Sequence, residues 1–158
     1  MHFFKGLGLV LLFVCGLAAG YLLAAFEGRR CRQAEGFLAL LRHIRLQIDC
    51  FSQPMGQILA SVDGGVRRLC GTPRMAPDFP TLLQQTPLLL PEEACVLLRD
   101  FSNTLGSSYR EEQLRCCDYY IARLVPLCER LRTELPKRLR LAWILPLAVA
   151  GALILLLL

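Results

Sequence analysis

Two stretches of this chain carry no charged side chain, residues 6–26 and residues 141–158. An apolar run of about 18 residues is long enough to cross a lipid bilayer as an α-helix. The two runs lie near the ends of the sequence and enclose a polar region, residues 27–140. The pattern therefore predicts a membrane hairpin, in which two transmembrane helices flank one domain and tether both of its ends.

Basic residues gather on the polar side of both apolar runs: Arg29, Arg30, Arg32, Lys137, Arg138 and Arg140. On the terminal sides of the two runs, Lys5 is the only Lys or Arg in the sequence. Because Lys and Arg beside a span are retained in the cytoplasm, we expect residues 27–140 to be cytosolic and both termini to lie outside. The net charge of +5 is explained by these flanks, so we expect the membrane as a partner and no nucleic acid.

The first run has an alternative interpretation as a cleaved signal peptide. It is longer than the apolar core of such a peptide, and the basic residues directly after it oppose translocation, so an uncleaved anchor is favoured. Gly16, Gly20 and Ala24 recur at four-residue spacing within it. Small residues at this spacing allow membrane helices to pack closely, although a glycine-tolerant anchor has the same pattern.

The polar region has the apolar spacing of helices. Between residues 30 and 51, apolar residues recur three or four positions apart, at Phe37, Leu41, Ile44, Ile48 and Phe51. Ser52 is the expected N-cap of a second helix reaching Val62, with residues 63–65 ending or bending it. Residues 71–80 are predicted as a loop and residues 80–85 as a short helix. A further helix is expected from Pro91 to a C-cap at Gly106.

The longest helix is predicted to begin at a capping box formed by Ser108 and Glu111. Its apolar residues alternate at spacings of three and four: Leu114, Cys117, Ile121, Leu124, Cys128, Leu131 and Leu135. This seam passes through Pro126, which we expect to bend the helix without ending it, and Pro136 marks the join to the second apolar run. With no alternating strand pattern, the fold class is predicted to be all-α.

The chain contains eight cysteines, which we interpret as reduced core residues of a cytosolic domain. His43 and Cys50 are the nearest approach to a metal-ligand pair, but two ligands do not define a metal site. We therefore expect no metal, no cofactor and no catalytic group. A small membrane redox or metal-binding protein that uses these cysteines remains the alternative class, with a transporter or holin-like subunit as another.

An ordered set of residues resembles stage III sporulation protein AB, a family of endospore-forming bacteria. The residues that carry the resemblance are Arg29-Arg30-x-Arg32-Gln33, Phe37-x-x-Leu40-Leu41-x-x-Ile44, Gln47-Ile48, Pro54, Ile58-Leu59, Phe101-Ser102-x-x-Leu105-Gly106-Ser107, Glu112-Gln113-Leu114 and the apolar tail. Tyr109 departs from the family, whose members tend to have an acidic residue there. The resemblance covers nearly the whole chain, in order.

The resemblance implies a non-enzymatic platform or assembly subunit of the sporulation secretion-like complex that links mother cell and forespore. It places the chain in the mother-cell (outer forespore) membrane, and its cytosolic domain looks like those of type II secretion and type IV pilus platforms. A cytosolic secretion-type ATPase and other stage III sporulation proteins are the implied partners, and homo-oligomerisation is open. Our candidate docking residues are Arg42, Arg45, Arg115 and Asp118, which fall outside the apolar seam.

Overall fold

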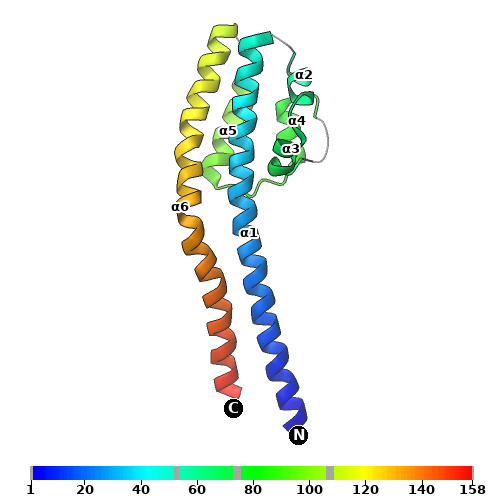
Figure 1. Cartoon of the computed structure of the whole chain (residues 1–158), viewed down its shortest axis with the longest axis vertical. Helices are drawn as coiled ribbons and strands as arrows, with labels where there is room; N and C mark the ends of the chain where they lie inside the picture. The colour runs from blue at the N-terminus through cyan, green and yellow to red at the C-terminus, as the bar shows by residue number, and fades with distance from the viewer. Residues whose placement is uncertain (1, 52–53, 73–75, 106–108, 158) are drawn as a thin grey trace. The chain divides into compact units, whose positions relative to one another are not determined.

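The computed structural model describes residues 2–51, 54–72, 76–105 and 109–157. Each regular element in these ranges is a helix, which confirms the all-α prediction for the described part of the chain (Figure 1). The elements in order are α1 His2–Phe51, α2 Met55–Ala60, α3 Gly64–Cys70, α4 Phe79–Gln85, α5 Glu92–Thr104 and α6 Arg110–Leu157.

The chain divides into two compact units. We call Met1–Arg29 together with Arg132–Leu158 the terminal unit, and Arg30–Leu131 the central unit. Helices α1 and α6 each contribute to both units, so the anchor and the first domain helix that the sequence suggested as separate elements belong to one continuous helix.

In the terminal unit, the N-terminal part of α1 packs against the C-terminal part of α6 through glycines. A Cβ atom added at Gly16 would lie 3.1 Å from Ala150 Cβ and 3.3 Å from the Pro146 carbonyl oxygen. One added at Gly20 would lie 3.1 Å from the Trp143 ring. The absence of a side chain at these two positions therefore sets how closely the two segments approach.

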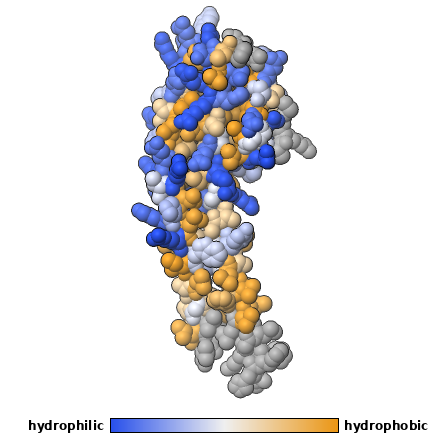
Figure 2. Space-filling model, in the orientation of Figure 1, coloured by the Kyte–Doolittle hydropathy of each residue, from blue (hydrophilic) through white to orange (hydrophobic). Residues whose placement is uncertain are grey.

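Within the predicted spans, the outward surface of the terminal unit is apolar. Large hydrophobic side chains are exposed along both of its segments, among them Val10, Leu11, Leu22, Leu141, Ile144 and Leu145. Figure 2 shows hydrophobic residues gathered over these segments and hydrophilic residues over the central unit. Among the described residues, α1 is the one helix long and apolar enough to cross a membrane; its most apolar 18-residue window has a mean hydropathy of 2.1 and is 6% buried. Because signal sequences share these properties, the finding indicates membrane association without fixing the topology.

The central unit is built on the predicted helical seam. Phe37, Leu41, Ile44 and Ile48 of α1 are all at least 95% buried, in agreement with their spacing. In α6, the residues of the seam that are buried are Cys117, Leu124, Cys128 and Leu131. Leu114, Ile121 and Leu135 are only half-buried, so fewer residues of α6 are buried than the spacing predicted.

The helix boundaries differ from the sequence prediction between residues 60 and 70. Helix α2 ends at Ala60, so Val62 lies outside it although it is buried. Asp63 begins a new helix, because its carboxylate accepts a hydrogen bond from Gly65 N at 2.7 Å and caps α3. The two glycines, interpreted from sequence as helix breakers, are therefore the first residues of α3.

Other boundaries agree with the sequence or lie outside the described residues. Helix α4 matches the short helix expected at residues 80–85, and α5 begins directly after Pro91. Helix α6 continues through Pro126, as expected, and also through Pro136. The predicted caps at Ser52, Gly106 and Ser108 lie outside the described residues.

A buried amide in α1 holds the end of α3 and the loop between α4 and α5. Gln33 is 4% exposed, and its Nε2 donates to the carbonyl oxygens of Cys70 and Pro87, both at 2.9 Å. Its Oε1 accepts from Leu89 N at 2.7 Å. Each of these backbone groups would otherwise be costly to bury, so Gln33 stabilises the position of both segments.

Candidate docking surface

Two of the four candidate docking residues form an ion pair with each other. Arg45 Nε of α1 donates to Asp118 Oδ1 of α6 at 2.6 Å, although the two residues are 73 positions apart. This hydrogen bond is the main reason that the pKa of Arg45 is raised further. Arg45 Nη1 also lies 3.8 Å from Asp49 Oδ2. Because the pair is exposed, it joins the two helices but contributes little stability.

Arg110 extends this charged cluster across the end of α1. Its guanidinium donates to the carbonyl oxygens of Ile48 and Asp49 and, at 3.2 Å, to Asp49 Oδ1. The last carbonyls of a helix lack partners within it, and a basic side chain is a suitable donor. Arg45, Asp49, Arg110 and Asp118 thus form one charged cluster within the central unit.

The other two candidates, Arg42 and Arg115, are exposed. Neither forms an ion pair with another described residue. Each guanidinium can therefore donate hydrogen bonds to an acidic group of a partner without losing an internal ion pair. The sequence placed all four candidates outside the seam but contained no sign that Arg45 and Asp118 would pair.

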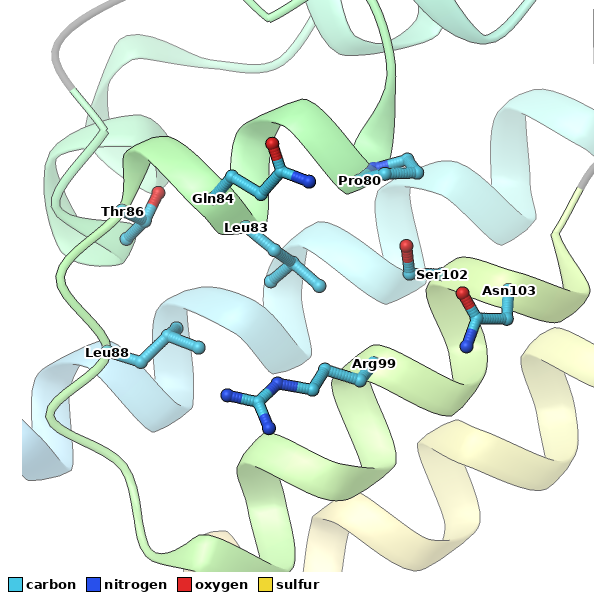
Figure 3. Close-up of a pocket in the computed structure, with 8 residues that line it drawn as sticks. All are labelled: Pro80, Leu83, Gln84, Thr86, Leu88, Arg99, Ser102 and Asn103. Atoms are coloured by element: carbon cyan, nitrogen blue, oxygen red, sulfur yellow. The ribbon is translucent and has the colours of Figure 1, made fainter.

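A groove that the sequence analysis missed lies between α4 and α5 (Figure 3). Its volume is about 530 Å³. The lining combines apolar and hydrogen-bonding side chains: Pro80, Leu83, Gln84, Thr86, Leu88, Arg99, Ser102 and Asn103. Arg99, Ser102 and Asn103 stand three and four positions apart on α5, and this polar helix face is the signal in the sequence that could have revealed the groove.

The groove offers hydrogen bonds and one positive charge rather than a reactive group. In Figure 3, the Arg99 side chain extends from α5 toward Leu88, while Gln84 and Leu83 come from α4. The Thr86 hydroxyl is already used, because it donates to Leu82 O at 2.7 Å. The groups present suit a polar or acidic peptide segment better than a small reacting substrate.

Burial makes most of the cysteines unreactive. Cys31, Cys70, Cys95, Cys117 and Cys128 are all buried, and the eight cysteines of the described chain form no disulfide with one another. Desolvation raises the pKa of Cys70 and Cys117 to about 12 and that of Cys128 to about 11. Since the thiolate is the nucleophile and the metal ligand, burial opposes both roles.

His43, which the sequence brought nearest to a metal-ligand pair with Cys50, has a hydroxyl group as its hydrogen-bonding neighbour. The His43 ring nitrogen Nε2 lies 3.0 Å from the Ser61 hydroxyl, which itself donates to Ile58 O at 2.8 Å. Among the described residues, no group of three or more His, Cys, Asp or Glu side chains is placed to hold a metal ion. His43 is thereby assigned a structural contact between α1 and the end of α2.

Comparison with known proteins gives no independent family assignment: no family model matches the chain, and no curated protein or solved structure is significantly similar to it.

Proposed function

We propose that this chain is a non-enzymatic platform subunit of a sporulation secretion-like membrane complex, and that its central unit docks a cytosolic secretion-type ATPase. The complex and its mother-cell membrane are suggested by the residues that resemble the stage III sporulation protein AB family. The observation that carries the physical part is α1, a single helix whose N-terminal part exposes apolar residues and whose C-terminal part contributes Phe37 and Ile44 to a packed helical core.

The proposal includes two membrane spans, with the second formed by residues 141–158. Support comes from the close contacts of Gly16 and Gly20 with the C-terminal part of α6 and from the exposed apolar side chains of both segments. A bilayer would cover this apolar surface, whereas water would make its exposure costly. The basic flanks support a cytosolic location for the central unit in this proposal.

Within the central unit, we assign the ATPase contact to the exposed cations Arg42 and Arg115. Arg45 and Asp118 would support that surface by joining α1 to α6 beside it. The redox alternative is less well supported, since the cysteines with the largest pKa shifts are buried in the core. For a transporter, charged residues within the spans would be expected, and residues 6–26 and 141–158 contain none.

Capture of the ATPase tests the proposal. The full chain, purified in mild detergent, should retain the sporulation ATPase, and the double variant Arg42→Glu/Arg115→Glu should lose most of this binding because each reversal adds repulsion at the contact. The control is Arg67→Glu/Arg68→Glu on α3, which makes the same charge change at another place. Because Arg67 and Arg68 donate to the carbonyl oxygens of Val62 and Gly64, the thermal midpoint of this variant is measured beside its binding. Failure of the wild-type chain to retain the ATPase would refute the platform function, and native affinity of the double variant would refute this docking face.

A further inference from the structure

The terminal unit has an excess of positive charge that is concentrated beside its apolar surface. Its described acidic residues are Glu27 and Glu134, and Arg138 contacts both: Nη1 lies 3.6 Å from Glu27 Oε1 and Nη2 lies 2.8 Å from Glu134 Oε2. One guanidinium thus contacts both carboxylates and offsets part of their negative charge within the unit. Among the residues of this unit whose side chains are described, the other exposed cations are Arg29, Arg132, Lys137 and Arg140.

Three of these cations border exposed apolar side chains. Arg29 follows Phe26 by three residues on α1, and Phe26 is 45% exposed. On α6, Arg140 directly precedes Leu141, which is 57% exposed, and Lys137 stands one helical turn earlier. Charged groups on long stems at this position reach the headgroup layer while the neighbouring apolar surface contacts acyl chains.

We propose that Arg29, Lys137 and Arg140 form a collar that binds the headgroups of anionic phospholipids. This inference rests on the proposed insertion of both apolar segments. Arginine can hold a phosphate group through two parallel hydrogen bonds, and lysine adds a point charge. A zwitterionic headgroup presents a phosphate beside its own cation, so the collar selects lipids with a net negative charge.

The collar and the docking surface of the central unit are proposed to bind different partners, lipid headgroups and a protein. A basic cluster at the border of a span meets lipid headgroups at high local concentration, without the need for a further protein. Arg138 stays outside the collar, because its guanidinium is occupied by Glu27 and Glu134. It has a positioning role: its single positive charge weakens the repulsion that Glu27 and Glu134 would exert on an anionic lipid.

Lipid selectivity of the full chain tests the collar. The chain is reconstituted in vesicles of equal phosphatidylglycerol and phosphatidylcholine, and the association of spin-labelled forms of each lipid is measured by electron spin resonance. We expect about a tenfold preference for phosphatidylglycerol at an ionic strength of about 0.01 M, which collapses toward no preference at about 1 M. A preference that is absent, or that does not change with salt, would overturn the proposal.

Charge-matched variants locate the preference. The triple variant Arg29→Gln/Lys137→Gln/Arg140→Gln should lose most of it, whereas Arg42→Gln/Arg99→Gln/Arg115→Gln, with the same charge change in the central unit, should retain it. Equal loss of the lipid preference in both variants would refute the collar. The collar would also be refuted if the variant Arg29→Gln/Lys137→Gln/Arg140→Gln lost ATPase capture but kept its lipid preference. Alkaline extraction of the wild-type chain separates the collar from the proposed function. If the chain resists extraction but shows no lipid preference, the collar alone is refuted. If the chain is extracted, it is not inserted in the membrane, and both proposals are refuted.

Discussion

At Gly36, α1 lies close against the end of α3. A Cβ atom built there would lie 2.8 Å from both Cys70 N and the Leu69 carbonyl carbon, and these backbone atoms cannot move aside as a side chain could. We predict that Gly36→Ala lowers the thermal midpoint of the chain by several degrees. Overpacking costs about 1–3 kcal/mol and exceeds the gain of about 1 kcal/mol from the better helix propensity of alanine.

Gly64→Ala is the control for this prediction. No atom lies within 4 Å of the position of its Cβ, so the substitution should leave the midpoint unchanged or raise it slightly. Circular dichroism of the detergent-solubilised chain measures both variants. Equal midpoints for Gly36→Ala and the wild type would contradict the close approach of the α3 backbone to residue 36.

The buried thiols predict how stability depends on pH. Burial raises the pKa of Cys70 and Cys117 to about 12, above the value of 9.0 expected for an exposed thiol. Because the folded pKa exceeds the unfolded one, the stabilisation is complete below about pH 9 and is lost as pH rises toward 12. The thermal midpoint should therefore fall as the pH is raised above about 9.

Two variants separate this effect from the titration of other groups. Cys117→Ala should show a smaller fall than the wild type at the same pH, since one thiolate fewer forms on unfolding. Cys50→Ala removes an exposed thiol and should show the full fall. If all three proteins lose stability with the same pH dependence, the thiols are not the cause.

At the scale of elements, the seam between α1 and α6 sets the stability of the central unit. Ile44 is fully buried, and Leu124 of α6 is 1% exposed. Ile44→Asp should lower the free energy of unfolding by several kcal/mol, because it places a carboxylate among apolar groups without a partner. Leu46→Asp, at a position 54% exposed on the same helix, should have little effect. Similar denaturation midpoints for the two variants would contradict the seam assignment.

The seam could be predicted because helical periodicity is local. Phe37, Ile44 and Ile48 show their common face by spacing alone, and the structure buries all three. The start of α3 at Asp63 was missed because the Gly64-Gly65 pair has low helix propensity, and the side-chain cap on Gly65 N outweighs it.

The parts that could not be predicted depend on contacts between residues distant in sequence. Gln33 is buried only because the end of α3 and the loop at Pro87 meet it, 37 and 54 positions away. The candidate docking residues were placed outside the seam from their spacing, but the pairing of Arg45 with Asp118 depends on the register between α1 and α6. The groove between α4 and α5 likewise requires the packing of two helices.

At the scale of the whole molecule, the two units have surfaces suited to different surroundings. The terminal unit exposes Val10, Leu22 and Ile144, each more than 60% accessible, whereas the exposed faces of the central unit carry charges such as Arg42 and Arg115. A bilayer around the first unit and water around the second satisfy both surfaces. In the proposed topology, the basic flanks favour the cytoplasmic side for the central unit.

The native chain carries its own probe of this topology, since Cys50 is an exposed thiol at the end of α1 in the central unit. We predict that a membrane-impermeant maleimide fails to modify Cys50 in intact cells and modifies it fully after the membrane is permeabilised, as measured by the mass of the Cys50 peptide. The control is Gly64→Cys in a Cys50→Ala background; a Cβ atom at residue 64 meets no atom within 4 Å, so the substitution should be tolerated and show the same dependence. Both positions must lie on one side of the membrane, because they belong to the same compact unit. Modification of both thiols in intact cells would place the central unit outside the cytosol, where it could not meet a cytosolic ATPase, and would refute the proposed function together with the topology.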